Sequence, residues 1–355
     1  MTERTDMTGR VIGAACLWAS TLLHAPAALA SDMASDVASD VAADVSVDGG
    51  ANCPALRWTT LGTAGGPVPT PERSEPANLL TAGGRHILVD AGDGTVVQLA
   101  RAGVDLGAID AVFISHAHWD HVGGLSAVVG LRWMNQYPGV LTVYGPAGTR
   151  SIVEGILASL RTPASIGFGL GTPPPRPADG VRVVELADGE TRALGQGLSV
   201  TAAANSHFDH DGHPDPDAVS LSLRFALGMR SVTYTGDTGP TPALARLARG
   251  ADLLVSEIID LDRLLAEIRA RRKDAPPAML AAMARHLSTH HLVPEALGEA
   301  AAEAGVGRIV LTHFAIPPGP LAGSEPTLRA GIGTHYAGPV ALARDLDTFD
   351  VECAG

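Results

Sequence analysis

The chain has 355 residues, enough for one large domain or two ordinary ones. Hydrophobic residues make up 46% of the chain but aromatic residues only 4%, so small aliphatic side chains are expected to fill most of the core. The formal net charge of −13 argues against a nucleic-acid partner, because Lys and Arg supply most of the affinity for phosphate.

Residues 1–30 have the pattern of an export signal. A polar start precedes VIGAACLWASTLLHAPAALA, an apolar stretch that ends in the small-residue sequence Ala-Leu-Ala. A membrane anchor is one alternative, but His24 and Pro26 interrupt the stretch. A lipid anchor at Cys16 is another, but almost no apolar stretch precedes that residue. We therefore predict cleavage near Ala30, no membrane span in the mature chain, and a periplasmic or secreted protein.

Residues 31–51, SDMASDVASDVAADVSVDGGA, carry an aspartate every four residues and few large apolar side chains. This composition predicts a disordered acidic linker, followed by a folded domain over residues 52–355. Two cysteines remain after removal of the signal, Cys53 and Cys353, one at each end of that domain. In an oxidising compartment they are expected to form a disulfide, and two free thiols are the alternative.

The stretch ISHAHWDHVGG, residues 114–124, follows a run of strand-forming residues. His116 and His118 are two positions apart, so in an extended segment their side chains point to the same side. Asp120 and His121 follow where the chain turns into a predicted helix. Imidazole and carboxylate are common ligands of zinc and related ions. The spacing therefore predicts a metal site, which we favour over a histidine-rich surface loop.

Three further strand-like runs end in a metal-binding residue type: LSVTAAANS before His207, SVTYTG before Asp237, and RIVLT before His313. Helical patterns such as TPALARLARG and PEALGEAAAEAG lie between the strands. The alternation predicts an α/β protein whose loops carry its chemistry. His210 and His213 are alternatives to His207, which we prefer because it follows its strand directly.

Together these motifs resemble the metallo-β-lactamase superfamily, whose fold is a four-layer αββα sandwich. ISHAHWDHVGG matches the His-x-His-x-Asp-His signature of that superfamily. LGTAGGPVP, HILVDAGDG, TGDTG, ADLLVSE and LTHF also occur here in the superfamily's order. The resemblance covers nearly all of the predicted folded domain. It looks nearest to the branch that holds ribonuclease Z and the zinc-dependent arylsulfatases and phosphodiesterases.

The resemblance implies two zinc ions per chain, and manganese or iron would suit the same nitrogen and oxygen ligands. By position, one ion would be bound by His116, His118 and His207, and the other by Asp120, His121 and His313, with Asp237 bridging both. True β-lactamases lack such a bridging aspartate, so antibiotic hydrolysis is not expected. The oxygen-reducing di-iron branch has a carboxylate where His118 stands, so a redox role is not expected either.

Two residue positions beside the ligand motifs receive further roles. In the ribonuclease Z-like branch, a histidine placed like His291 protonates the leaving group, so the resemblance implies a general acid there, with His290 as the alternative. Asp120 is expected to steer the nucleophile in addition to binding metal. Trp119 fills the variable position of the signature, where it either forms an apolar wall of the pocket or packs under a loop.

From these features we predict an exported hydrolase that cleaves a small phosphodiester, sulfate ester or similar ester by means of metal-bound hydroxide. Lactone hydrolysis is the alternative within hydrolases, and a non-catalytic metal-binding module is the alternative outside them. Cleavage of RNA is not expected, because of the export signal, the net charge and the lack of a basic RNA-binding insertion. Arg269, Arg271, Arg272 and Lys273 are interpreted as a solvated helix face. The sequence does not indicate an oligomeric state.

Overall fold

The computed structural model describes residues 53–166 and 175–353. The predicted signal peptide (1–30) and acidic linker (31–51) lie outside the described residues and stay predictions. No helix in the described part of the chain is long and apolar enough to cross a bilayer.

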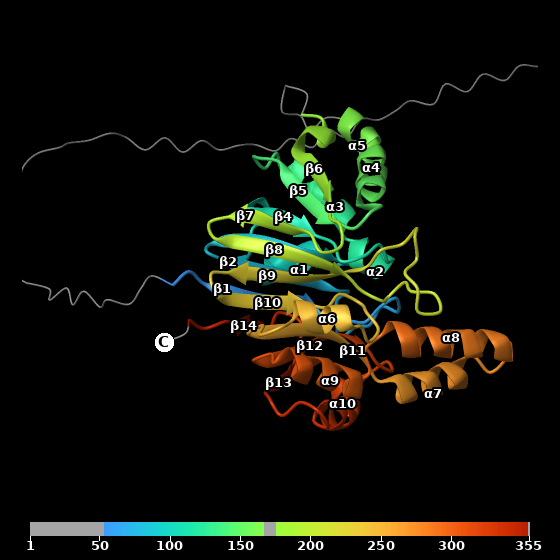
Figure 1. The fold of residues 1–355 in the computed structure, drawn as a ribbon. Coiled ribbons are helices and arrows are strands. Elements are labelled where there is room, and N and C mark those ends of the chain that lie inside the picture. Colours follow the sequence, from blue (N-terminus) through green and yellow to red (C-terminus); the bar gives the residue numbers. More distant parts are fainter. Residues whose placement is uncertain (1–52, 167–174, 354–355) are drawn as a thin grey trace, which may run out of the picture. The chain divides into compact units, whose positions relative to one another are not determined.

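Two seven-stranded sheets face one another, and helices cover their outer faces (Figure 1). In spatial order the first sheet contains β14 (Thr348–Asp350), β1 (Leu56–Gly62), β2 (Ala77–Ala82), β3 (Arg85–Ala91), β4 (Ile109–Phe113), β5 (Leu141–Gly145) and β6 (Val181–Glu185). The second contains β13 (Val340–Leu342), β12 (Arg308–Ala315), β11 (Leu253–Ile259), β10 (Arg230–Tyr234), β9 (Leu221–Leu227), β8 (Leu198–Ala204) and β7 (Thr191–Gly195). Both sheets mix antiparallel and parallel pairs.

Helices pack on both outer faces, which gives the four-layer αββα sandwich. The first sheet is followed or covered by α1 (Thr95–Arg101), α2 (Trp119–Val122), α3 (Leu125–Met134), α4 (Thr149–Ser159) and α5 (Arg161–Ile166). The second is associated with α6 (Pro242–Leu247), α7 (Leu261–Arg271), α8 (Pro277–His290), α9 (Pro294–Ala304) and α10 (Glu325–Ile332). The helix predicted after the histidine motif, VGGLSAVVGLRWMN, corresponds to α3, and Asp120 and His121 lie in the separate short helix α2. The pattern at residues 294–305 forms α9, which begins at Pro294 and is capped by Gly305.

Aromatic side chains occupy the centre of the core between the two sheets, although few are present in the chain. The ring centroids of Trp58 and Tyr234 lie 5.6 Å apart, and those of Phe113 and Phe225 lie 5.3 Å apart. All four side chains are fully buried. Apolar burial of this kind is the main stabilising contribution to folding, and aromatic pairs add to it. A further apolar cluster lies between the second sheet and its helices, and another lies between the first sheet and its helices.

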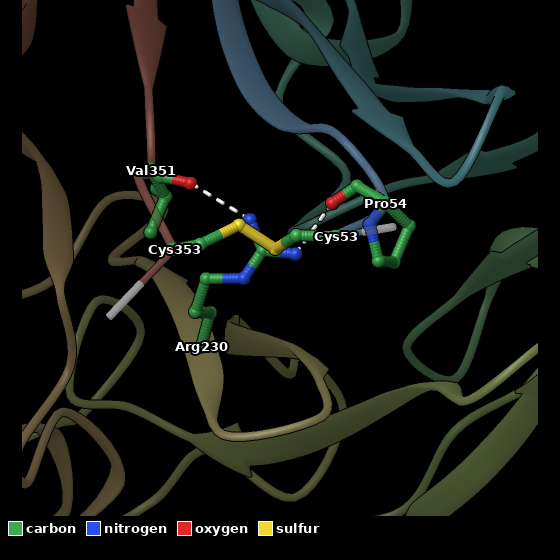
Figure 2. The surroundings of a disulfide bond; sticks show 5 residues. All are labelled: Cys53, Pro54, Arg230, Val351 and Cys353. Carbon is green, nitrogen blue, oxygen red and sulfur yellow. Dashed lines mark hydrogen bonds between the residues drawn. A yellow bond between two sulfur atoms is a disulfide. The ribbon is translucent and has the colours of Figure 1, made fainter. Parts of the chain in front are cut away.

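The two ends of the folded domain are joined by the predicted disulfide between Cys53 and Cys353 (Figure 2). Arg230 lies beside it, where its Nη1 donates a hydrogen bond to the carbonyl oxygen of Val351 at 2.8 Å and its Nη2 donates one to the carbonyl oxygen of Pro54. The guanidinium thus holds both terminal segments next to the covalent bond.

Candidate metal centre

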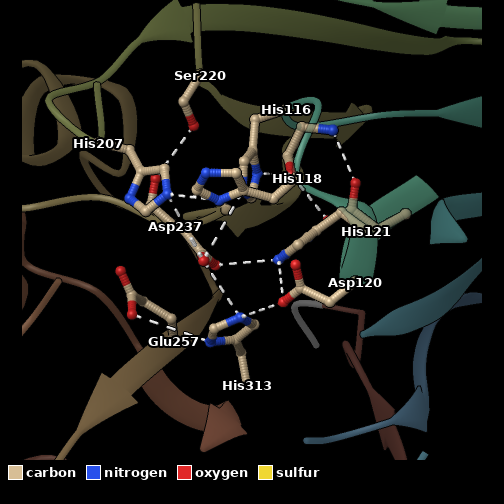
Figure 3. Close-up of polar contacts among 12 residues, drawn as sticks. His116, His118, Asp120, His121, His207, Ser220, Asp237, Glu257 and His313 are labelled. Carbon is tan, nitrogen blue, oxygen red and sulfur yellow. Dashed lines mark hydrogen bonds and ion pairs between the residues drawn. The ribbon is translucent and has the colours of Figure 1, made fainter. Parts of the chain in front are cut away.

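The seven side chains predicted to bind metal come together at one edge of the sandwich (Figure 3). β10, β11 and β12 are parallel, and β8 runs in the same direction because β9 is antiparallel to both β8 and β10. Their carboxyl ends therefore meet at a common edge. The loop after β4 of the other sheet brings the histidine motif to the same place. Metal-binding side chains at or near the ends of short strands thus form the site from distant parts of the chain.

A first set consists of three histidines and Asp237. The Nδ1 atom of His118 lies 3.1 Å from Nε2 of His116 and 3.1 Å from Nε2 of His207. Oδ2 of Asp237 lies 3.8 Å and 3.9 Å from the same two Nε2 atoms. Tetrahedral coordination with metal–ligand bonds of about 2.1 Å puts ligand atoms roughly 3.4 Å apart. The four atoms therefore have the spacing that one ion requires.

A second set shares Asp237 with the first. Oδ2 of Asp120 lies 3.6 Å from Nε2 of both His121 and His313. Asp237 presents Oδ1 to His121 at 3.4 Å and Oδ2 to His313 at 3.2 Å. Nε2 of His121, Nε2 of His313 and Oδ1 of Asp237 are buried without a hydrogen-bond partner. Such atoms are costly to leave unpaired, and a divalent cation would satisfy all three.

The protonation states of the first set suit metal binding. Burial lowers the pKa of His207 to about 3 and holds the pKa of His116 well below its usual value. Both imidazoles are therefore neutral at neutral pH, as ligation requires. Burial acts to raise the pKa of Asp237, but the imidazoles of His313 and His121 outweigh it and hold that pKa well below its ordinary value. The bridging carboxylate is thus ionised.

Asp90 orients two of the histidines, a role that we did not assign from the sequence. Its Oδ2 lies 2.8 Å from Nδ1 of His121 and accepts hydrogen bonds from Ser115 Oγ and Tyr234 Oη, each at 2.8 Å. Since Ser115 donates to Asp90, its oxygen accepts from Nδ1 of His116 at 3.0 Å. These contacts leave Nε2 of both imidazoles available for metal. The position of Asp90 in the middle of the HILVDAGDG motif, near the end of β3, is the signal that could have identified it.

The backbone around the site is tightly constrained. Asp90 and His313 have positive φ angles of 60° and 42°, which cost energy in non-glycine residues and occur most often at functional sites. Gly66 and Gly92 pack directly against Asp120: a Cβ on Gly66 would lie 2.2 Å from Oδ2 of Asp120, and one on Gly92 would lie 2.2 Å from its carbonyl oxygen. Only glycine allows these two loops to approach Asp120 so closely.

The structure distinguishes His207 from its two sequence alternatives. His207 is buried, and its Nδ1 donates a hydrogen bond to the carbonyl oxygen of His290 at 2.9 Å. His210 and His213 instead pair with each other through their backbones, and Nε2 of His210 lies 3.0 Å from Asp215 at the surface. His207 alone of the three therefore lies in the cluster.

His291 lies beside the cluster and pairs with a buried acid, Glu257. Nδ1 of His291 is 2.7 Å from Oε2 of Glu257, whose Oε1 accepts from the backbone N–H of Thr238 at 2.6 Å. Burial acts to lower the pKa of His291, but Glu257 outweighs it and raises the pKa to about 9. The ring centroid of His291 lies 5.1 Å from that of His207. A buried imidazole with a raised pKa thus lies next to the candidate metal site.

His290 and Glu257 complete the comparison with the sequence. The His290 side chain is only partly buried and faces His286, with their Nδ1 atoms 2.8 Å apart, so it lacks the carboxylate partner that His291 has. We did not assign a role to Glu257 from the sequence. A glutamate inside the buried strand β11 is unusual unless it is paired, and the ADLLVSE motif could have suggested it.

A cavity of about 620 Å³ opens beside the cluster, and its lining includes Asp120, Trp119 and Arg73. Trp119 is 78% exposed, so it forms an apolar wall of the cavity and does not pack under a loop. An exposed tryptophan next to a metal-binding motif offers a flat surface for a ring of the substrate.

The sequence is similar to a superfamily model and to curated ribonuclease Z proteins. A family model described as the beta-lactamase superfamily domain matches residues 85–314. Ribonuclease Z of Mycobacterium marinum is 32% identical over 302 residues, which cover 82% of this chain and 98% of that protein. Ribonuclease Z of Mycolicibacterium paratuberculosis is 33% identical over 303 residues, which cover 83% of this chain and 98% of that protein.

Solved structures show the same fold. A metallo-β-lactamase fold protein of Bacillus subtilis matches with a TM-score of 0.60 at 20% identity and covers 84% of this chain and 100% of its own. The short form of human tRNase Z matches with a TM-score of 0.57 at 20% identity and covers 84% and 100%, respectively. At these identities the comparison speaks only to the fold, and it confirms the predicted αββα sandwich.

The curated relatives contradict two predictions made from the sequence. We predicted an exported hydrolase of a small ester and no nucleic-acid partner, whereas the similar proteins are ribonucleases. The prediction rested on the export signal, the net charge and the lack of a basic insertion. Net charge describes only the electrostatic potential far from the protein, and a local basic surface can still bind phosphate. The arylsulfatase-like alternative finds no support among these relatives.

Proposed function

The chain belongs to the metallo-β-lactamase superfamily and to its ribonuclease Z branch, and from this premise we propose that it is a metal-dependent ribonuclease that cleaves a phosphodiester bond of tRNA precursors. The observation that carries the proposal is that Asp237 contacts both sets of histidines, in a chain 32% identical to a ribonuclease Z over almost all of that relative. Two metal sites joined by a carboxylate are a common arrangement for phosphodiester hydrolysis.

We assign two zinc ions to the two sets of side chains, and manganese or iron would suit the same donors. One ion would be held by His116, His118 and His207, and the other by Asp120, His121 and His313, with Asp237 shared. Bound there, the ions would supply Lewis-acid activation of water and of the phosphate group.

Asp120 contributes a negative charge where the nucleophile must be held. Burial acts to raise the pKa of Asp120, but His121 and His313 outweigh it and lower that pKa to about 2. The side chain is therefore ionised at neutral pH and accepts a hydrogen bond from an attacking water molecule. Its position against Gly66 and Gly92 fixes the direction of that hydrogen bond.

His291 is proposed to protonate the leaving ribose oxygen. Its Nδ1 is bound to Glu257, which leaves the Nε2 proton available for the substrate. A ribose alkoxide is a poor leaving group, so a positioned acid is worth about 10²–10⁴-fold in rate. Glu257 acts through His291: it holds the imidazole in place and keeps it protonated.

Incubation of zinc-loaded protein with labelled tRNA precursor transcripts, extended at either end, tests the proposal. We expect cleavage at a defined position, inhibition by a chelator, and no cleavage by the Asp237→Ala variant. Hydrolysis of bis(p-nitrophenyl) phosphate serves as a control for a competent metal site. Transcripts that stay intact under conditions where this small diester is hydrolysed would contradict RNA as the substrate.

A further inference from the structure

Helices α7 and α8 form a hairpin that extends from the body of the described domain (Figure 1). No residue of either helix is buried. The hairpin is nevertheless attached directly to the metal site, because α8 ends at His290, whose carbonyl oxygen accepts from Nδ1 of His207, and His291 follows at once. One end of the hairpin thus touches the catalytic groups and the other is surrounded by solvent.

The free end of the hairpin is strongly basic in an acidic chain. Four of the chain's 25 basic residues lie within residues 269–273, and they include Lys273, the only lysine in the sequence. Over residues 261–290 there are six basic residues and three acidic ones, whereas the whole chain has a net charge of −13. The charge on the hairpin is therefore opposite in sign to the charge on the protein as a whole.

Most of these basic side chains lack an acidic partner. On a solvated helix face, residues of opposite charge usually form pairs three or four positions apart. At the tip only Arg271 has one, Glu267. The exposed side chains of Arg269, Arg272 and Lys273 form no ion pair or hydrogen bond with the described residues. Unpaired positive charges at a protruding tip are suited to binding phosphate.

We propose that the tip of the α7–α8 hairpin, formed by Arg269, Arg272 and Lys273, binds the phosphate backbone of the RNA substrate at a distance from the scissile bond. This inference rests on the proposed function and assigns a second contact to it. The 14 residues of α8 span about 21 Å at 1.5 Å per residue. One strand of a duplex carries a phosphate for about every 3.4 Å of helix axis, so the tip reaches roughly six nucleotides along the axis from the cleaved bond.

Contacts of this kind position RNA without reading its sequence. RNA is favoured over an anionic membrane surface because the hairpin begins at the catalytic site. One RNA molecule can therefore contact the tip and the catalytic site at the same time. Each phosphate contact releases counterions, and three such contacts contribute about 2–3 to the slope of log affinity against log salt concentration.

A kinetic comparison with the zinc-loaded enzyme tests the inference. The variant Arg269→Ala/Arg272→Ala/Lys273→Ala is compared with Arg161→Ala/Arg176→Ala/Arg192→Ala, which removes the same charge from exposed positions elsewhere. We expect the tip variant to raise KM for a tRNA precursor at least tenfold and to reduce the salt slope of kcat/KM by about 2–3. Its hydrolysis of bis(p-nitrophenyl) phosphate should stay at the wild-type rate. Unchanged KM and slope, or an equal loss in the control variant, would overturn the inference.

A footprint on Lys273 separates failure of the inference from failure of the proposed function. Because this is the only lysine, an amine-acylating reagent modifies one side chain besides the terminal amine, and mass spectrometry follows it. RNA should protect Lys273 severalfold in the wild-type enzyme. Protection without RNA cleavage would support the basic tip and contradict the ribonuclease proposal. Cleavage without protection, or protection by anionic vesicles but not by RNA, would overturn the basic tip.

Discussion

Nδ1 of His291 lies 2.7 Å from Oε2 of Glu257, and both side chains are buried at the edge of the metal centre. The contact joins the residue that follows α8 to the buried strand β11. A buried imidazole would ordinarily be neutral, but this carboxylate keeps it protonated. The pair therefore provides a proton donor that needs no solvent, and this property leads to the first two predictions.

The variant His291→Ala should lose activity in a manner that depends on the leaving group. Cleavage of RNA, which expels an alkoxide, should slow by about 10²–10⁴-fold, because the acid is missing. Bis(p-nitrophenyl) phosphate releases a stable anion and should be affected far less. The zinc content should not change. His290→Ala is the matched control and should remain close to wild type on both substrates. Equal losses on the two substrates would mean that His291 positions the substrate and donates no proton.

The pH profile of kcat/KM should have an alkaline limb set by His291. Since Glu257 raises the pKa of His291 to about 9, the imidazolium is present below that pH and activity falls as the pH rises through it. In Glu257→Gln the ion pair is lost, and burial then lowers the pKa of His291 against only the weaker effects of Asp237 and Asp120. The alkaline limb should then move to lower pH while the zinc content stays constant. An alkaline limb that does not move would contradict the pairing.

The variant Asp237→Ala should lose both ions, whereas His313→Ala should lose only the second. Asp237 contacts both sets of histidines, and its removal leaves each set one ligand short. Elemental analysis after zinc loading and desalting measures the stoichiometry, and RNA cleavage should disappear in both variants. If Asp237→Ala retained two ions, the bridging role would be wrong.

Trp119 should stack on a nucleobase next to the scissile phosphate. Stacking of a base on an aromatic side chain is worth about 1–3 kcal/mol, so Trp119→Ala should raise KM for RNA by about 5- to 150-fold. Trp119→Phe should retain most of the affinity, and neither variant should alter hydrolysis of bis(p-nitrophenyl) phosphate greatly. An unchanged KM in Trp119→Ala would show that the exposed ring has no part in binding.

Loss of the Cys53–Cys353 disulfide should lower the free energy of unfolding. Closing a loop with a sequence separation of 300 residues restrains the unfolded chain by up to about 5 kcal/mol. Chemical denaturation of Cys353→Ser measures the loss, and wild-type protein in reductant is the control. Zinc content should be unchanged, because the bond lies away from the ligands. Equal stability of the oxidised and reduced wild type would contradict the prediction.

Residues that act through their own position in a strand or loop could be predicted from the sequence. Because side chains two positions apart in an extended segment point to the same side, His116 and His118 could be assigned to one site. The ends of the predicted strands indicated three further ligands, His207, Asp237 and His313. The superfamily motifs then gave the αββα fold. Apart from His313, which lies inside β12, these residues lie where a local pattern changes from strand to loop, and such a change can be detected in a single sequence.

Residues that act through a distant partner could not be predicted in this way. Asp90 orients His121 across 31 positions of sequence, and Glu257 binds His291 across 34. No local pattern encodes either pairing, because both depend on how the sheets place the strand ends. A nucleic-acid partner was excluded for a related reason: net charge averages over the whole surface and does not describe a local basic segment such as residues 269–273.

Titration of metal-free protein with zinc, with tRNA precursor cleavage as the readout, tests the central claim most directly. The claim is that the protein cleaves RNA with two metal ions that have Asp237 as a common ligand. It predicts that cleavage is absent without metal, rises with added zinc and reaches its plateau at two equivalents per chain. Full RNA cleavage at one equivalent or in the presence of chelator, or no cleavage at two, would contradict it.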